Sequence, residues 1–86
     1  MRHRPERLVT ARAYALFTSA LATDSSPSRG QAAAAVRHQL HRCGGARGCL
    51  AEVAYAYGDH PDTAAVRMRW ARSLAARTCR RARRNR

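Results

Sequence analysis

The apolar residues of this chain are mostly alanine and recur at helical spacing, a pattern that limits the fold to closely packed helices. Isoleucine is absent, and no segment shows the polar–apolar alternation of a half-buried strand. Alanine has the highest intrinsic helix propensity. The 86 residues leave room for one small domain with a thin core. We therefore expect an all-α fold, a small four-helix domain without a deep catalytic cleft.

Turn-forming residues separate the four segments that carry this helical pattern. We expect helices over residues 5–23, 28–43, 49–57 and from 62 to at least 77. Ser28 and Gln31 have the spacing of a capping box at the start of the second helix. A pair of glycines, Gly44 and Gly45, follows its end and permits left-handed backbone geometry. The second helix is therefore the one with the clearest boundaries.

The net charge of +12 is unevenly distributed along the chain. All 17 basic residues are arginine, and the segment from Arg67 to the C-terminus contains nine of them and no acidic residue. So large a charge on a short chain indicates a polyanionic partner, most simply nucleic acid, with an acidic protein or membrane surface as alternatives. We expect a single helical domain over 1–77, followed by an arginine-rich tail over 78–86.

Residues 49–77 have the layout of a helix-turn-helix, in which the second helix enters the major groove of DNA. The first helix of this motif would end on Gly58, and the second would start at Asp62 or Thr63. The expected buried stripes are Leu50, Val53, Ala54 and Tyr57 on the first helix and Ala64, Met68, Ala71 and Ala75 on the second. The candidate DNA contacts are Thr63, Ala65, Arg69, Arg72, Ser73, Arg77, Arg80 and Arg81.

This motif resembles the helix-turn-helix of region 4 of bacterial sigma factors, especially the extracytoplasmic-function group. The resemblance covers roughly residues 30–76, with matches at Ala51, Glu52, Val53, Ala54, Gly58, Thr63, Arg67, Met68, Ala71, Arg72 and Leu74. In that family the module binds promoter DNA and contacts RNA polymerase, so the resemblance implies these two partners. Nothing in the chain corresponds to region 2 of the family, and we do not expect a working sigma factor.

Val66 and Trp70 depart from the family pattern, because they occupy positions that are usually polar or basic. With Leu74 they form a second apolar stripe, which we expect to pack against the first helix. If exposed, this stripe would serve as a homodimer or partner surface. Arg67 lies at the edge of the buried stripe, and we expect it to form a structural ion pair with Glu52.

The cysteines and histidines give only weak indications of a disulfide, metal or redox site. Three cysteines are an odd number, which argues against a disulfide framework and favours a reduced, cytoplasmic setting. The residues His38, His41, Cys43 and Cys49 match no common structural zinc pattern, so no metal is expected. Cys43 and Cys49 flank a glycine-rich turn, which leaves a reversible redox pair as an option.

Signals for secretion and catalysis are weak. The N-terminus imitates a secretion signal, but its apolar stretch is short and interrupted, and no segment is long enough to cross a bilayer. No nucleophile–base arrangement or phosphate-cradling loop is visible, so neither enzymatic activity nor a cofactor is expected.

The sequence thus favours a cytoplasmic DNA-binding transcription regulator. The alternatives are a helical module that binds an acidic protein, such as a polymerase subunit or regulator, a plain helical hairpin, and a protein that binds structured RNA.

Overall fold

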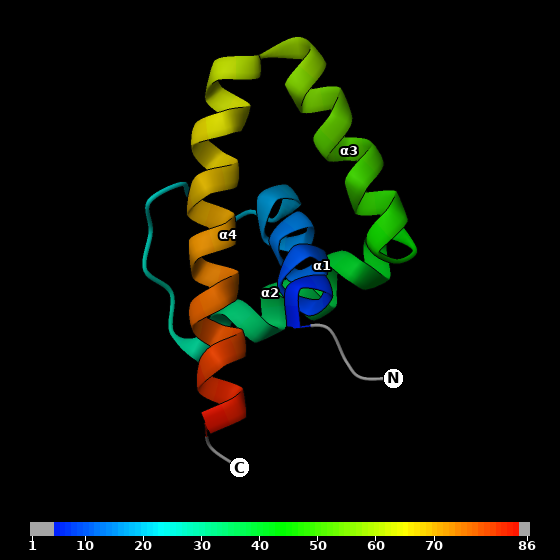
Figure 1. Cartoon of the computed structure of the whole chain (residues 1–86). Coiled ribbons are helices and arrows are strands. Elements are labelled where there is room, and N and C mark those ends of the chain that lie inside the picture. Colours follow the sequence, from blue (N-terminus) through cyan, green and yellow to red (C-terminus); the bar gives the residue numbers. More distant parts are fainter. Residues whose placement is uncertain (1–4, 85–86) are drawn as a thin grey trace.

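The computed structural model describes the backbone of residues 5–84 and the side chains of residues 8–78. Over this range the chain forms four helices and no strand (Figure 1). They are α1 (Pro5–Thr18), α2 (Arg29–Cys43), α3 (Ala46–Asp59) and α4 (Pro61–Arg84). The all-α, four-helix fold expected from the sequence is confirmed. None of the described helices combines the length and the apolar character that crossing a bilayer requires.

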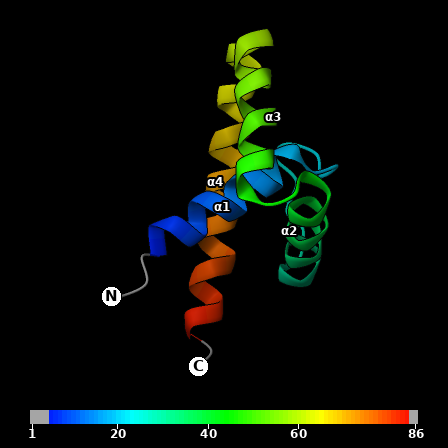
Figure 2. The same ribbon diagram turned by 90° about the vertical axis from the view of Figure 1, so that its right-hand side faces the viewer.

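Helix α1 is the centre of the fold, because its contacts with the other three helices are more extensive than those of any other helix. It crosses α4 and lies between α4 and α3 (Figure 1), and α2 packs beside it (Figure 2). The core is small and rich in alanine. Its buried members are Ala13, Ala15, Leu16, Phe17, Ala32, Val36, Cys49, Val53, Ala64, Met68, Trp70, Ala71, Leu74 and Ala75. The stripe expected to face inward on α4 is therefore buried as predicted.

The boundaries of α2 are those expected from its sequence. The Ser28 hydroxyl accepts from the Gln31 backbone N–H at 3.0 Å, and the Gln31 side chain accepts from the Ser28 N–H at 2.9 Å. This reciprocal pair satisfies two of the helix's unpaired N–H groups. At the other end, Gly44 has φ 76° and ends α2 in the left-handed conformation.

The turn after α2 brings α3 unusually close to it. A Cβ atom on Gly48 would lie 1.8 Å from the carbonyl oxygen of Cys43, a distance that no side chain can occupy. Glycine at position 48 therefore allows the first turn of α3 to pack directly on the end of α2.

Helix α1 is five residues shorter than the expected 5–23. It ends at Thr18, where polar side chains compete for the last carbonyl groups. Ser19 Oγ donates to the carbonyl of Leu16 at 2.6 Å, and Thr18 Oγ1 donates to that of Ala15 at 3.1 Å. Such local bonds offer the backbone an alternative to further helix. Residues 19–28, called the α1–α2 linker below, then run alongside α4 (Figure 1).

The α3–α4 connection differs from the expected turn. Helix α3 continues through Gly58 to Asp59, and only His60 separates it from α4. The prediction that Gly58 ends the helix was wrong: its φ is not positive, and it lies inside α3. Pro61 then starts α4, a position where its missing N–H costs nothing.

The expected buried stripe of α3 was largely wrong as well. Only Val53 is buried, whereas Ala54, Leu50 and Tyr57 are exposed. Tyr57 nevertheless stacks its ring on Phe17, with 6.3 Å between the ring centroids. Helix α3 diverges from α4 away from their shared turn and leans on α1 instead, so one face remains uncovered (Figure 1).

Helix α4 extends further than its expected minimum. It continues to Arg84 and so includes most of the segment predicted as a separate tail. Its side chains beyond Thr78, those of Arg80 and Arg81 included, lie outside the described residues.

Candidate functional site

The solvent-facing side of α4 carries most of the candidate contacts predicted from the sequence. Arg69, Arg72, Ser73 and Arg77 are all exposed, and Ala65 is half-buried beside them. Thr63 is exposed near the start of the helix. The first four recur at intervals of three, one and four residues, which keeps them on one broad helical face. We call Arg69, Arg72, Ser73 and Arg77 the basic face of α4.

The face of α4 opposite the basic face is largely buried, and this division follows from the sequence. Alanine, methionine and leucine occupy the positions that meet α1, while arginine and serine occupy the opposite side. Beyond Asp62 in its first turn, α4 contains no acidic residue. The basic face therefore projects positive charge that no carboxylate of its own helix offsets.

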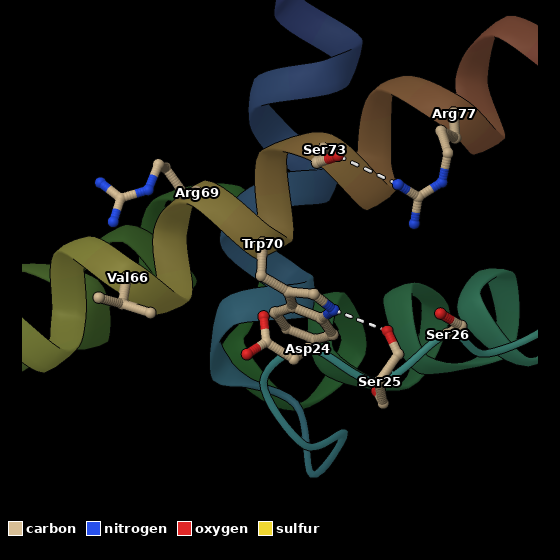
Figure 3. A pocket seen from close by; sticks show the side chains of 8 residues that line it. All are labelled: Asp24, Ser25, Ser26, Val66, Arg69, Trp70, Ser73 and Arg77. Carbon is tan, nitrogen blue, oxygen red and sulfur yellow. Dashed lines mark hydrogen bonds between the residues drawn. The ribbon is translucent and has the colours of Figure 1, made fainter.

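One edge of the basic face borders an open groove between α4 and the α1–α2 linker, with a volume of about 450 Å³ (Figure 3). Its walls are formed by Asp24, Ser25, Ser26, Val66, Arg69, Trp70, Ser73 and Arg77. Arg69 and Arg77 lie on either side of Trp70 along α4, as Figure 3 shows. Arg77 Nη1 donates to the hydroxyl of Ser73 at 3.0 Å.

Trp70 fixes the linker on the side of this groove opposite α4. Its indole Nε1–H donates to the carbonyl oxygen of Ser25 at 2.9 Å (Figure 3). Only 8% of Trp70 is exposed, so the bond is largely shielded from water. A buried indole N–H needs such a partner. The linker therefore keeps a fixed position relative to α4.

Arg67 is a structural residue, and its partners belong to the end of α1 and the linker. Its Nε donates to the carbonyl of Phe17 at 2.7 Å, and its Nη1 to the hydroxyl of Thr23 at 2.8 Å. Its Nη2 reaches the carbonyls of Ser19 at 2.9 Å and Leu16 at 3.4 Å. A cation at a helix C-terminus satisfies the last carbonyls and favours the helix dipole. Burial lowers the pKa of Arg67 from its usual value.

The predicted ion pair between Glu52 and Arg67 was wrong. Glu52 pairs instead with Arg42 of α2, whose Nη2 lies 2.9 Å from Glu52 Oε1 and 3.0 Å from Oε2. This hydrogen bond and the carboxylate charge of Glu52 raise the pKa of Arg42 above its usual value. Arg67 lies on the side of α4 that faces α1, so its guanidinium reaches backbone carbonyls rather than α3.

The second apolar stripe of α4 is divided between core and surface. Trp70 and Leu74 are buried, as expected for a stripe that packs inward. Val66 remains 45% exposed at the edge of the groove. The stripe was expected to pack against α1 alone, but Trp70 also contacts the linker, where it donates to Ser25.

The two cysteines in the described part of the chain are free thiols. Cys49 is fully buried, and its thiol donates to the carbonyl of Gln39 at 3.6 Å. Burial, helped by a hydrogen bond with Cys43, raises the pKa of Cys49 to about 11. Its reactive thiolate is therefore scarce at neutral pH. Among the described residues, no three histidine, cysteine or carboxylate side chains are grouped to hold a metal ion.

Comparison of the chain with protein-family models, curated proteins and solved structures finds no match. The resemblance to sigma-factor region 4 thus stays a prediction from the sequence.

The linker is the part of the site that sequence reasoning missed. Asp24, Ser25 and Ser26 were interpreted only as a break between helices, since serine and aspartate are common turn formers. The available signal was Trp70, a residue with a polar N–H on an otherwise inward-facing stripe, because such a group requires an acceptor nearby.

Proposed function

We propose that this protein is a cytoplasmic DNA-binding transcription regulator that contacts duplex DNA with the basic face of α4. The observation that carries the proposal is the exposure of three arginines and a serine on one side of a helix that contains no acidic residue beyond Asp62 in its first turn. Arginine and serine are common donors to phosphate oxygens, and arginine also recognises guanine edges.

The acidic residues at the α3–α4 tip favour the middle of α4 over its first turn as the contact region. Asp59 and Asp62 lie at the tip where α3 meets α4, and they would repel phosphates. The usual helix-turn-helix inserts the first residues of its second helix into the major groove. We therefore propose that Arg69, Arg72 and Arg77 approach the DNA, with Thr63 more peripheral.

The experiment measures binding of a short fluorescent duplex by anisotropy over a salt series. We expect the affinity of the intact chain to fall steeply with salt, because bound arginines release counterions. The double variant Arg69→Ala/Arg72→Ala should bind more weakly and lower the salt slope by about 2. The matched control is Arg29→Ala/Arg37→Ala, which removes two exposed arginines from α2.

Equal losses for both double variants would mean that only total charge matters, and that would contradict docking by α4. Tighter binding of a double-stranded RNA competitor would contradict the choice of DNA. Circular dichroism of each variant verifies that the helices are retained.

An interaction module for an acidic protein, such as an RNA polymerase subunit, is the second candidate. It is favoured by the uncovered face of α3, where Tyr55 is 73% exposed, and by exposed Val66. The same apolar surface would serve a homodimer. Binding to a polymerase subunit that survives Arg69→Ala/Arg72→Ala but is lost in Tyr55→Ser would support this candidate over DNA.

A further inference from the structure

We propose that the groove between α4 and the α1–α2 linker binds the sugar–phosphate backbone of one strand of the duplex. This inference rests on the proposed function and narrows it to a particular edge of the basic face. It predicts that Arg69 and Arg77, which line the groove, contact phosphates, and it adds the linker as a second contact element.

The groove has the chemistry of a nucleic-acid backbone site. Arg69 and Arg77 are eight residues apart, which separates their backbones by about 12 Å along α4. The exposed hydroxyls of Ser26 and Ser73 lie along the same groove and are suited to donate to phosphate oxygens. Arg77 already donates to Ser73, so its guanidinium is held toward this part of the helix.

The shape of the groove suits a strand better than a small ligand. It is open to solvent, whereas sites for small molecules usually enclose most of the ligand surface. Trp70 lies between the two arginines along α4, and the exposed Val66 lies beyond Arg69 (Figure 3), so the groove has an apolar surface against which a sugar can pack. The hydrogen bond from Trp70 to Ser25 holds the linker side of the groove in place before any partner binds. Binding therefore does not have to order the linker, which lowers the entropic cost of binding.

The charge of Asp24 lies where the proposed strand would pass, so its removal should change the affinity for the duplex. Asp24 is the one acidic residue among the groove's walls and has a left-handed backbone with φ 72°. A carboxylate beside a phosphate lowers affinity, and more so at low salt. Asparagine tolerates left-handed geometry about as well as aspartate. Asp24→Asn therefore removes the charge without straining the linker.

The test compares two variants that change the net charge by the same amount. Asp24→Asn should bind the duplex several-fold more tightly at low salt, with the difference shrinking as salt rises. Asp59→Asn is the matched control, because Asp59 is exposed at the α3–α4 tip and outside the groove. It should bind like the unmodified chain.

A second pair of variants removes positive charge. Arg77→Ala should weaken binding several-fold and lower the salt slope by about 1, whereas Arg47→Ala, an exposed residue of α3, should have little effect. Equal affinities of Asp24→Asn and Asp59→Asn for the duplex would overturn the proposal that the groove binds a strand. An affinity of Arg77→Ala equal to that of the unmodified chain would overturn it as well. The proposed function would still stand if Arg69→Ala/Arg72→Ala weakened binding. A chain that binds no duplex at low salt would refute both.

Discussion

The guanidinium of Arg67 lies over the indole ring of Trp70, with its Cζ atom 4.9 Å from the ring centroid. The two side chains are neighbours on α4 and bind successive parts of the same segment. Arg67 bonds to residues between Leu16 and Thr23, and Trp70 bonds to Ser25. The stacked pair thus fixes both the end of α1 and the path of the linker.

Replacing Arg67 by methionine should lower the free energy of unfolding by about 3 kcal/mol. Methionine keeps much of the apolar stem but leaves the carbonyls of Phe17 and Ser19 without their donor. Urea denaturation followed by circular dichroism measures the change. Glu52→Gln is the informative control, since it removes the charge of an exposed pair with Arg42 and should change the free energy of unfolding much less than Arg67→Met does. A loss in Glu52→Gln as large as that in Arg67→Met would contradict the assigned partners.

Trp70→Phe should cost about 1 kcal/mol or slightly more, because it retains a ring in the core and removes the donor to Ser25. Thermal unfolding by circular dichroism is the measurement. Trp70 is also the chain's single tryptophan and is buried. In the unmodified protein, its emission should shift to longer wavelength on unfolding. An emission maximum that does not change in urea would contradict the packing of Trp70.

Two glycine-to-alanine substitutions should change stability in opposite directions. Gly48→Ala forces a Cβ against the Cys43 carbonyl and should destabilise the fold by about 3 kcal/mol or more. Gly58→Ala meets open space inside α3 and should stabilise it by about 0.5 to 1 kcal/mol. Denaturation midpoints measure both. A destabilised Gly58→Ala would instead indicate the turn glycine of a helix-turn-helix.

Stability should fall at high pH because of Cys49. Its pKa is raised to about 11 in the folded chain from a usual value of 9.0. The neutral thiol is therefore favoured by folding, and its contribution is complete below pH 9 and lost between about pH 9 and 11. Unfolding free energies at several pH values should show a steeper decline for the unmodified chain than for Cys49→Ala. Parallel curves would show that Cys49 ionises equally in both states.

Local sequence rules account for the parts of the fold that depend on neighbouring residues. The capping box of Ser28 and Gln31 is one example, since both partners lie within one turn. The inward stripe of α4, with Met68 and Ala71, followed from helical periodicity alone. These features need no knowledge of distant segments.

The partners of Arg67 could not be predicted in this way. Its acceptors are mainly backbone carbonyls about fifty residues away, and every residue has a carbonyl, so the sequence carries no specific signal. Gly58 misled for a related reason, because glycine occurs both in turns and in helices.

The bonds from α4 to the linker also constrain how the newly made chain can fold. Arg67 reaches Phe17 across 50 residues, and Trp70 reaches Ser25 across 45. During synthesis on the ribosome, the first three helices emerge before the side chains that secure α1 and the linker exist. We therefore expect no stable N-terminal intermediate, and the protein should acquire its structure in one cooperative step once α4 has been released.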